Sequence, residues 1–315
     1  MPQSEIFELL NKNYHQRLKY IADNNITAYR LYDNDQLWLP VAIDIYANNA
    51  IIHCFALITD EEKLEIESSL KSLVNVHDFY YKDRTPRADH TGAVPKPTEP
   101  ESTPNPESPQ KEDKTIIIEE YGHKFQCNLS GYLDIGLFLD HRETRRWIGE
   151  QSKGKIVLNT FAYTGSFSIY AAANGAAKTY SVDLSKTYCE WIKKNLELNN
   201  LPHEQNWVYK MDTREFFKYA KKKNLKFDII IIDPPSFSRN KGKSFSVQKD
   251  HPQLINDALE VLTPTGFILF SNNKQGFRLQ NEKLSPCTIQ NIQRRTIPAD
   301  FTNYNAHYCF VIRPA

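Results

Sequence analysis

Three aspartates in the second half of the chain each follow a run of strand-forming residues, and carboxylates placed in this way can bind ligands. Asp233 follows the apolar run 227–232 and opens the segment Asp233-Pro234-Pro235-Ser236-Phe237, while Asp183 and Asp212 follow the runs 178–182 and 207–211. Proline fixes φ and has no N–H, so Pro234 and Pro235 must end a strand. The Asp233 carboxylate and the Pro234 carbonyl then remain as acceptors at the carboxyl edge of a sheet, where open α/β folds bind ligands.

The other two aspartates each have a functional and a structural interpretation. Asp183 stands about twenty residues after a glycine-bearing loop, where an acidic residue accepts hydrogen bonds from ribose hydroxyls. Asp183 or Ser185 could instead cap the next helix, and both roles are compatible if Ser185 caps and Asp183 binds. Asp212 could accept a hydrogen bond from an adenine amino group, or it could only cap the helix that it precedes.

The glycine-bearing loop, Asn159–Ser168, constrains the ligand further. It contains one glycine, Gly165, and not the three of a pyrophosphate-binding fingerprint. This argues against a dinucleotide dehydrogenase and favours a nucleoside without phosphates.

The elements that position these residues alternate between strand and helix. Expected strands are 155–160, 178–182, 207–211, 227–232 and 266–271, and the expected helices are 166–174, 185–199, 213–222 and 253–262. This alternation predicts a parallel sheet with helices on both faces. Two further strands, 287–294 and 307–312, have no helix between them. The predicted fold is therefore an α/β, Rossmann-like sheet of seven strands, mostly parallel, with one antiparallel strand.

The chain before this region divides into three parts. Residues 1–82 combine helical spacing with alternating strand-like stretches, which predicts a small α+β N-terminal module. Residues 83–114 are rich in proline and lack hydrophobic periodicity, so we expect a disordered linker. Residues 115–150 should form a β-hairpin and a connecting segment before the main domain, 151–315.

Composition sets limits on the protein class. The chain is 40% apolar and has no membrane-spanning run or signal-like N-terminus, so we expect a soluble cytoplasmic protein. Its five cysteines are scattered without a CxxC pair, which indicates neither a disulfide framework nor a metal site. The net charge of +1 means that any nucleic-acid function depends on local basic clusters.

Together these motifs resemble the class I S-adenosylmethionine-dependent methyltransferases, and among them the 23S ribosomal RNA methyltransferases. The closest likeness is to the guanine-N7 methyltransferase half of the bifunctional bacterial enzymes. It rests on the runs 136–142, Asn159–Ser168, 181–185, 233–237, 247–251 and 270–273.

The resemblance implies S-adenosyl-L-methionine as the cofactor and assigns residues to it. These are Phe138, Asp140, Arg142, Asn159, Tyr163, Thr164, Gly165, Asp183, Leu184, Asp212 and Asp233. Arg142 suits the methionine carboxylate as a charge-assisted partner, whereas we expect Arg145 and Arg146 on a solvated helix face.

The loops after the fourth and fifth strands restrict the target base. Neither loop contains a cysteine, which methylation of a pyrimidine carbon needs as a nucleophile, so a nitrogen is favoured. Asp233 and Pro234 would hold an exocyclic amine, or Asp233 would read the edge of a guanine methylated at N7, and Phe237 would stack on the flipped base.

We expect the substrate to be 23S rRNA or a large-subunit precursor. A cationic loop at 238–243 should contact phosphates, and the expected RNA-binding residues are Arg239, Lys241, Lys243, Asn272, Lys274 and Arg278. Guanine N2 methylation, a catalytically silent RNA-binding protein and a small-molecule methyltransferase are the alternatives.

Overall fold

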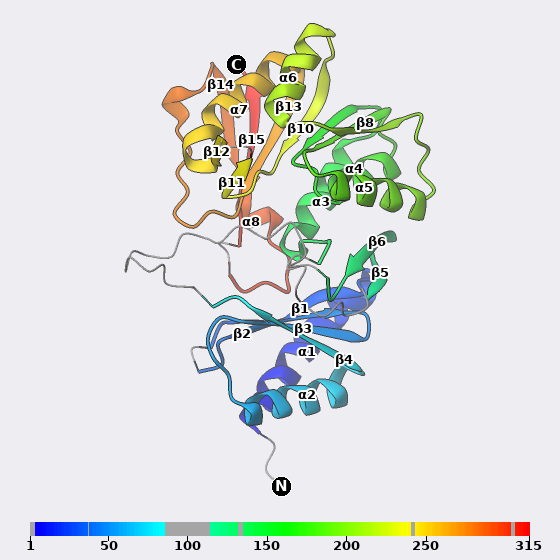
Figure 1. The fold of residues 1–315 in the computed structure, drawn as a ribbon, viewed down its shortest axis with the longest axis vertical. Coiled ribbons are helices and arrows are strands. Elements are labelled where there is room, and N and C mark those ends of the chain that lie inside the picture. Colours follow the sequence, from blue (N-terminus) through cyan, green and yellow to red (C-terminus); the bar gives the residue numbers. More distant parts are fainter. Residues whose placement is uncertain (1–3, 37, 86–113, 132–134, 241–242, 304–305) are drawn as a thin grey trace. The chain divides into compact units, whose positions relative to one another are not determined.

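The computed structural model describes residues 4–36, 38–85, 114–131, 135–240, 243–303 and 306–315 (Figure 1). The chain forms two compact units. One comprises Met1–Gly122, Gln126–Ile135 and Pro298–Asn303, and the other comprises His123–Phe125, Gly136–Ile297 and Tyr304–Ala315. Apart from its ends, the expected linker at 83–114 lies outside the described residues. Within the described part of the chain, no helix is long and apolar enough to cross a bilayer.

The larger unit is built on a sheet with the strand order β14-β15-β13-β10-β7-β8-β9 (Figure 1). Its strands are β7 (Ile156–Thr160), β8 (Lys178–Asp183), β9 (Asn206–Lys210), β10 (Phe227–Ile232), β13 (Leu262–Asn272), β14 (Cys287–Asn291) and β15 (Tyr308–Pro314). Strand β15 runs antiparallel to both β13 and β14, whereas the pairs from β13 through β9 are parallel. The predicted sheet of seven strands with one reversed strand is confirmed.

Helices cover both faces of this sheet because its central strands are apolar on both sides. In β10, Ile229 and Ile231 pack in one cluster with Phe167, whereas Ile230 and Ile232 pack in the other with Phe216. The helices are α3 (Arg142–Gln151), α4 (Ser166–Ala173), α5 (Lys186–Leu198), α6 (Thr213–Lys222), α7 (Val247–Val261) and α8 (Gln293–Thr296), with the short 3₁₀ turns η1 (Leu139–His141) and η2 (Asn281–Lys283).

The structure corrects two local predictions. The expected loop at 238–243 is largely a hairpin of β11 (Phe237–Asn240) and β12 (Lys243–Ser246), with Phe237 opposite Ser246. Helix α7 begins six residues before the expected 253 and continues through Pro252. One residue explains both: the Asp250 carboxylate accepts the Ser246 N–H at 2.7 Å and pairs with Arg214 at 2.9 Å, which ties the hairpin to α6 and α7.

The expected boundary at residue 150 falls inside α3. This helix packs against α4, and residues 136–297 belong to one unit. The division between units therefore lies before the helix, near residue 136.

The smaller unit contains a sheet in the order β1-β2-β3-β4 with α1 and α2 on one side (Figure 1). Its elements are α1 (Glu5–Asp23), β1 (Ala28–Asp33), β2 (Val41–Tyr46), β3 (Asn49–Cys54), α2 (Asp60–Val74) and β4 (Asp78–Asp83). The expected hairpin pairs β5 (Thr115–Glu120) with β6 (His123–Asn128), whose first three residues belong to the larger unit.

A segment from near the C-terminus completes the smaller unit. The Asp300 carboxylate accepts the backbone N–H of Arg30 at 2.8 Å, and the Arg30 guanidinium lies 4.5 Å from the Phe301 ring centre. The sequence alone did not reveal that residues 298–303 belong with the first eighty.

Candidate cofactor and base site

The register of the sheet brings the predicted ligand residues to one edge. Thr160 at the end of β7 pairs with Val182 of β8 and with Ile232 of β10, and Ile232 pairs with Phe270 of β13. The loop after Thr160 and the side chains that follow Val182 and Ile232 therefore start from adjacent strand ends.

Asp183 is fixed by the loop that faces it. Its carboxylate accepts the backbone N–H groups of Tyr163 and Ser185, each at 2.9 Å. Ser185 caps α5 by accepting the Tyr188 N–H, so its predicted capping role is confirmed, and ligand binding by Asp183 stays a prediction. Burial raises the pKa of Asp183, and the backbone N–H groups of Ser185 and Tyr163 oppose that rise.

The loop after β7 holds a strained backbone. Phe161 and Tyr163 have φ values of 52° and 51°, in the left-handed region that is uncommon for large side chains. Gly165 has a φ of 79°, and a Cβ there would lie 2.8 Å from Cγ2 of Ile192. Thr164 donates its hydroxyl to the carbonyl of Gly136 at 2.6 Å, which fastens the loop to the segment before η1.

Asn159 and Thr164 hold the loop after β7 in place with their side chains. Both are buried, and the Asn159 amide donates to the Ser168 hydroxyl at 3.0 Å. The structure thus gives these two residues a part in shaping the loop, and direct contact with a cofactor stays a prediction.

Two exposed apolar side chains adjoin the fixed carboxylate. Phe138 is 44% exposed and Leu184 is 46% exposed, although both lie in otherwise well-packed segments. The Phe138 ring lies 5.2 Å from that of Tyr163, whose N–H binds Asp183. Apolar surface beside a hydrogen-bond acceptor fits a nucleoside, which offers a flat ring and sugar hydroxyls.

Asp212 is the N-cap of α6, accepting the N–H groups of Arg214 and Glu215 at 2.9 and 3.3 Å. It is exposed, and the preceding N–H of Met211 donates to the carbonyl of Asp183 at 2.9 Å, which holds the two strand ends together. The capping interpretation is confirmed, and contact with an adenine stays a prediction.

The arginines of α3 differ from expectation at one position. Arg146 is exposed and lies 3.4 Å from Glu150, as predicted for a solvated face. Arg145 is only 1% exposed and donates to the carbonyl of Phe138 at 2.7 Å, so its placement on a solvated face was wrong. Arg142 is completely buried at the first turn of the helix.

Asp233 emerges from β10 as a partly exposed acceptor. Its side chain is 25% exposed, and the Ser271 hydroxyl donates to Oδ1 at 2.6 Å. Pro234 is buried behind it, and Phe237 is half-buried at the start of β11. The Ser236 hydroxyl donates to Oδ1 of Asn273 at 3.0 Å, which links this turn to the end of β13.

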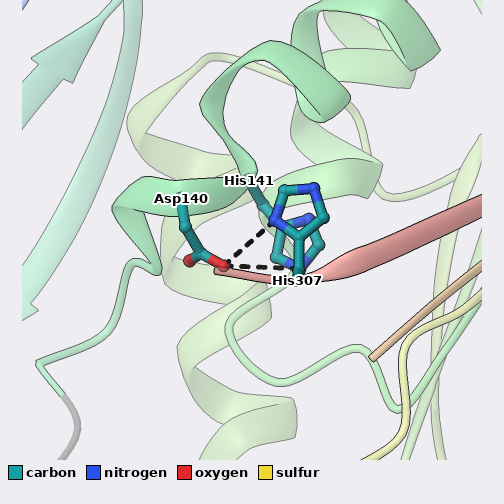
Figure 2. A group of neighbouring side chains, drawn as sticks. All are labelled: Asp140, His141 and His307. Carbon is teal, nitrogen blue, oxygen red and sulfur yellow. Dashed lines mark hydrogen bonds and ion pairs between the residues drawn. The ribbon is translucent and has the colours of Figure 1, made fainter. Parts of the chain in front are cut away.

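Sequence reasoning missed two histidines beside Asp140. Figure 2 shows His141 of η1 and His307, which precedes β15, stacked with their ring centres 4.1 Å apart. The Asp140 carboxylate lies 3.2 Å from Nδ1 of His307, and His141 Nε2 lies 3.6 Å from the Asp233 carboxylate. His141 was inside a motif run, but no local signal marked His307.

The expected RNA contacts fall into two groups. Lys274 and Arg278 line one hollow of about 470 Å³, together with Gln248 and Glu282. Asn272 is 1% exposed, and its Oδ1 accepts the Lys274 N–H at 3.1 Å. Lys241 and the side chains of Arg239 and Lys243 lie outside the described residues.

The strand order and the single reversed strand are those of the class I methyltransferase fold. Residues 99–305 match the family described as S-adenosylmethionine-dependent methyltransferase, and the chain belongs to this family. The protein is therefore an enzyme of that type with S-adenosylmethionine as its cofactor.

Similar proteins agree with this assignment. The chain is 36% identical over 312 residues to the ribosomal RNA large subunit methyltransferase K of Neisseria meningitidis serogroup B, covering 96% of this chain and 85% of that protein. It is 38% identical over 317 residues to the methyltransferase K/L of Shewanella loihica, with 97% of this chain and 43% of the relative covered. It thus spans less than half of the K/L protein.

A solved structure of SMU.776, a proposed methyltransferase complexed with SAH, superimposes with a TM-score of 0.80 at 30% identity. The match covers 98% of this chain and 80% of that one. The likeness therefore extends over both units of the chain and is not confined to the cofactor-binding sheet.

Proposed function

We propose that this protein methylates N7 of a guanine in 23S ribosomal RNA, either free or in a large-subunit precursor. The observation that carries the proposal is Asp233, a carboxylate fixed by Ser271 beside the cofactor edge and still partly exposed. The names of the relatives in Neisseria and Shewanella support the substrate class. A cytoplasmic location is part of the same proposal, because ribosomal RNA is the substrate.

In this proposal the cofactor binds at the carboxyl edge of the sheet, where β7, β8 and β10 end. The Asp183 carboxylate accepts the ribose hydroxyls, Leu184 and Phe138 cover apolar surface, and Asp212 accepts from the adenine amino group. Their exposure and hydrogen bonds are compatible with these roles. Asp140, whose side chain is 18% exposed, serves the methionine end, whereas Arg142 is completely buried and does not contact the cofactor directly.

S-adenosylmethionine supplies an electrophilic methyl group on a sulfonium. The guanine N7 lone pair forms the new N–C bond while the C–S bond breaks with its electrons on sulfur. Positive charge passes from sulfur to guanine, and no proton has to leave N7. The protein's task is to place N7 about 3 Å from the methyl carbon and in line with the sulfur.

Asp233 positions the base in this reaction. Its carboxylate accepts the guanine N1–H and amino N–H, and its negative charge stabilises the positive charge that develops on the ring. The half-buried Phe237 stacks on the flipped base, and the Pro234 carbonyl is a further acceptor.

A pyrimidine carbon target has less support. Segments 233–237 and 270–273 contain no cysteine. The cysteine paired opposite Ser271 is Cys309, which is completely buried, and burial raises the pKa of its thiol well above the usual range. A thiolate nucleophile is therefore disfavoured there.

The proposal also assigns a role to the cationic side chains outside the cofactor and base site. Lys274 and Arg278 around the hollow, together with Arg239, Lys241 and Lys243, would contact RNA phosphates. Asn272 adds a buried amide whose Nδ2 has no hydrogen-bond partner among the described residues. The N-terminal module would help to place the RNA.

Labelled methyl transfer to unmodified 23S rRNA, followed by nucleoside mass spectrometry, tests the proposal. We expect 7-methylguanosine; 2-methylguanosine would move the assignment to guanine N2, and RNA binding without any transfer would favour a silent binding protein. Asp233→Ala should lower kcat by about 100-fold or more with little change in SAH affinity. The matched control is Asp228→Ala, because Asp228 accepts the Ile156 N–H at 2.9 Å at the amino end of the same strand.

A further inference from the structure

Two buried histidines connect the Asp140 and Asp233 carboxylates. His141 is 5% exposed and His307 is completely buried. Their rings are stacked, with an interplanar angle of 15° (Figure 2). His141 Nε2 lies 3.9 Å from Asp140 Oδ2 and 3.6 Å from Asp233 Oδ2, so this ring faces both carboxylates.

The stacking geometry does not suit a metal site, although ligand-type atoms of Asp140, His141 and His307 lie within 4.8 Å of one another. The lone pair of an imidazole nitrogen lies in the plane of its ring, and zinc binds it at about 2.0–2.1 Å. Two nearly parallel planes separated by a stacking distance share no such point. The group is therefore better described as a hydrogen-bonded network.

The partners of each ring indicate where its proton lies. His307 Nδ1 lies 3.2 Å from the Asp140 carboxylate, which can only accept, and its Nε2 lies 2.9 Å from the Thr296 hydroxyl, which donates to the Gln293 carbonyl. His141 Nδ1 accepts from the Thr144 hydroxyl at 3.3 Å. The His141 proton then lies on Nε2 and points toward the carboxylates.

Charges around His141 favour its neutral form. Burial, then His307, lowers the pKa of His141, with Arg145 acting in the same direction, while Asp233 and Asp140 oppose the change. Burial alone would raise the pKa of Asp140, but His141, His307 and Arg145 lower it well below the usual range. Near neutral pH the network thus combines a neutral His141 with an ionised Asp140.

We propose that His141 is a positioning residue for methyl transfer: its Nε2 faces Asp233 Oδ2 at 3.6 Å, longer than a hydrogen bond, while Ser271 donates to Oδ1 at 2.6 Å. This inference rests on the proposed function, in which Asp233 receives the guanine. Contacts on both oxygens restrict rotation of the carboxylate before the base arrives. Because His141 is neutral, it does not cancel the negative charge of Asp233. That charge can then stabilise the positive charge that develops on guanine.

His307 supports this arrangement from the opposite face. Its ring packs against His141, and its Nδ1–H fixes Asp140, so a strand from the end of the chain orients a side chain in the 3₁₀ turn. Protonation of His141 would place a cation beside Asp233 and reduce its effect on the positively charged guanine. We therefore expect kcat to fall on the acidic side of neutrality.

The test compares His141→Gln, which retains an amide donor, with His141→Phe, which retains a ring without a donor. We expect His141→Phe to lower kcat by about 10- to 100-fold at unchanged SAH affinity, with partial recovery in His141→Gln. The acidic limb of kcat should move to lower pH in His141→Gln. A folding defect alone would not move the acidic limb of kcat. Thermal unfolding measures any such defect separately.

Wild-type kcat and pH profile in both variants would overturn the role of His141, as would equal losses in both with the acidic limb unmoved. The nucleoside product of the wild-type enzyme is measured in the same assay. A product other than 7-methylguanosine would contradict the proposed target, whereas the variant-to-wild-type ratios test His141 whatever the target.

Discussion

Asp183→Ala offers a quantitative test of the cofactor edge. In the proposed complex the carboxylate accepts two ribose hydroxyls, and a hydrogen bond to a charged group contributes about 1.5–3 kcal/mol. Loss of both corresponds to about 3–6 kcal/mol, or a factor of about 10² to 10⁴ in Kd. The substitution also leaves the N–H groups of Tyr163 and Ser185 without their acceptor, so we expect a loss of about 1–3 kcal/mol in folding stability.

Calorimetric titration with SAH measures the affinity, and urea unfolding measures the stability. Asp228→Ala is again the matched control, because it also removes a carboxylate that accepts a backbone N–H and the Thr263 hydroxyl, but at the opposite end of the strands. It should lower stability while leaving the Kd for SAH unchanged. A folded Asp183→Ala protein that binds SAH within about threefold of wild type would refute the assignment.

The same carboxylate predicts a pH dependence of binding. Burial raises the pKa of Asp183, and only the ionised form can accept two hydroxyl hydrogen bonds at full strength. SAH affinity should therefore fall as the pH is lowered through the pKa of Asp183, which lies above the ordinary aspartate value of about 3.9. Titrations across that range should show the fall in wild type and its absence in Asp183→Ala.

Three further substitutions test the scaffold. Gly165→Ala should cost about 2–4 kcal/mol, because φ is 79° and the new Cβ would lie 2.8 Å from Ile192; denaturant unfolding that shows no loss would contradict this geometry. Asp44→Ala should cost about 3–5 kcal/mol, because it removes two charge-assisted hydrogen bonds from the Arg30 guanidinium and leaves Asp33 as the remaining carboxylate partner. Burial opposes ionisation of Asp44, but Arg30 lowers the pKa of this carboxyl overall. The stabilisation that Asp44 gives the folded protein is therefore present above about pH 4 and lost as the pH falls. In acid unfolding, the stabilities of wild type and variant should converge. Ser185→Ala should lower the melting temperature through loss of about 1 kcal/mol of N-cap energy, and an unchanged value would show that the cap contributes nothing.

Much of the larger unit could be predicted because its signals are local. The isoleucines of β10 and the following prolines define a buried strand and its end, and the observed strand has the predicted bounds, 227–232. Helix α6 also has its predicted bounds, since Asp212 caps it and its apolar residues recur at helical spacing. Such features depend on neighbours within one or two turns.

Other features depend on contacts between distant residues. Asp250 accepts the Ser246 N–H of the β11–β12 hairpin and also pairs with Arg214 of α6, which is 36 positions away in the sequence. From the sequence alone, the cationic stretch was predicted to be a loop. Arg145 was expected in solvent because its neighbours are polar, yet it is buried where it binds the Phe138 carbonyl.

The sequence by itself determined the strand-to-helix alternation, the position of the three aspartates at strand ends and the absence of a cysteine from the segments 233–237 and 270–273. These follow from backbone propensity and side-chain chemistry, which short segments carry with them. Only the tertiary structure decided that Ser271 donates to one oxygen of Asp233 while His141 faces the other, and that His307 stacks on His141. Residues separated by 166 positions meet there because β15 returns antiparallel beside β13, and no local pattern records such an encounter.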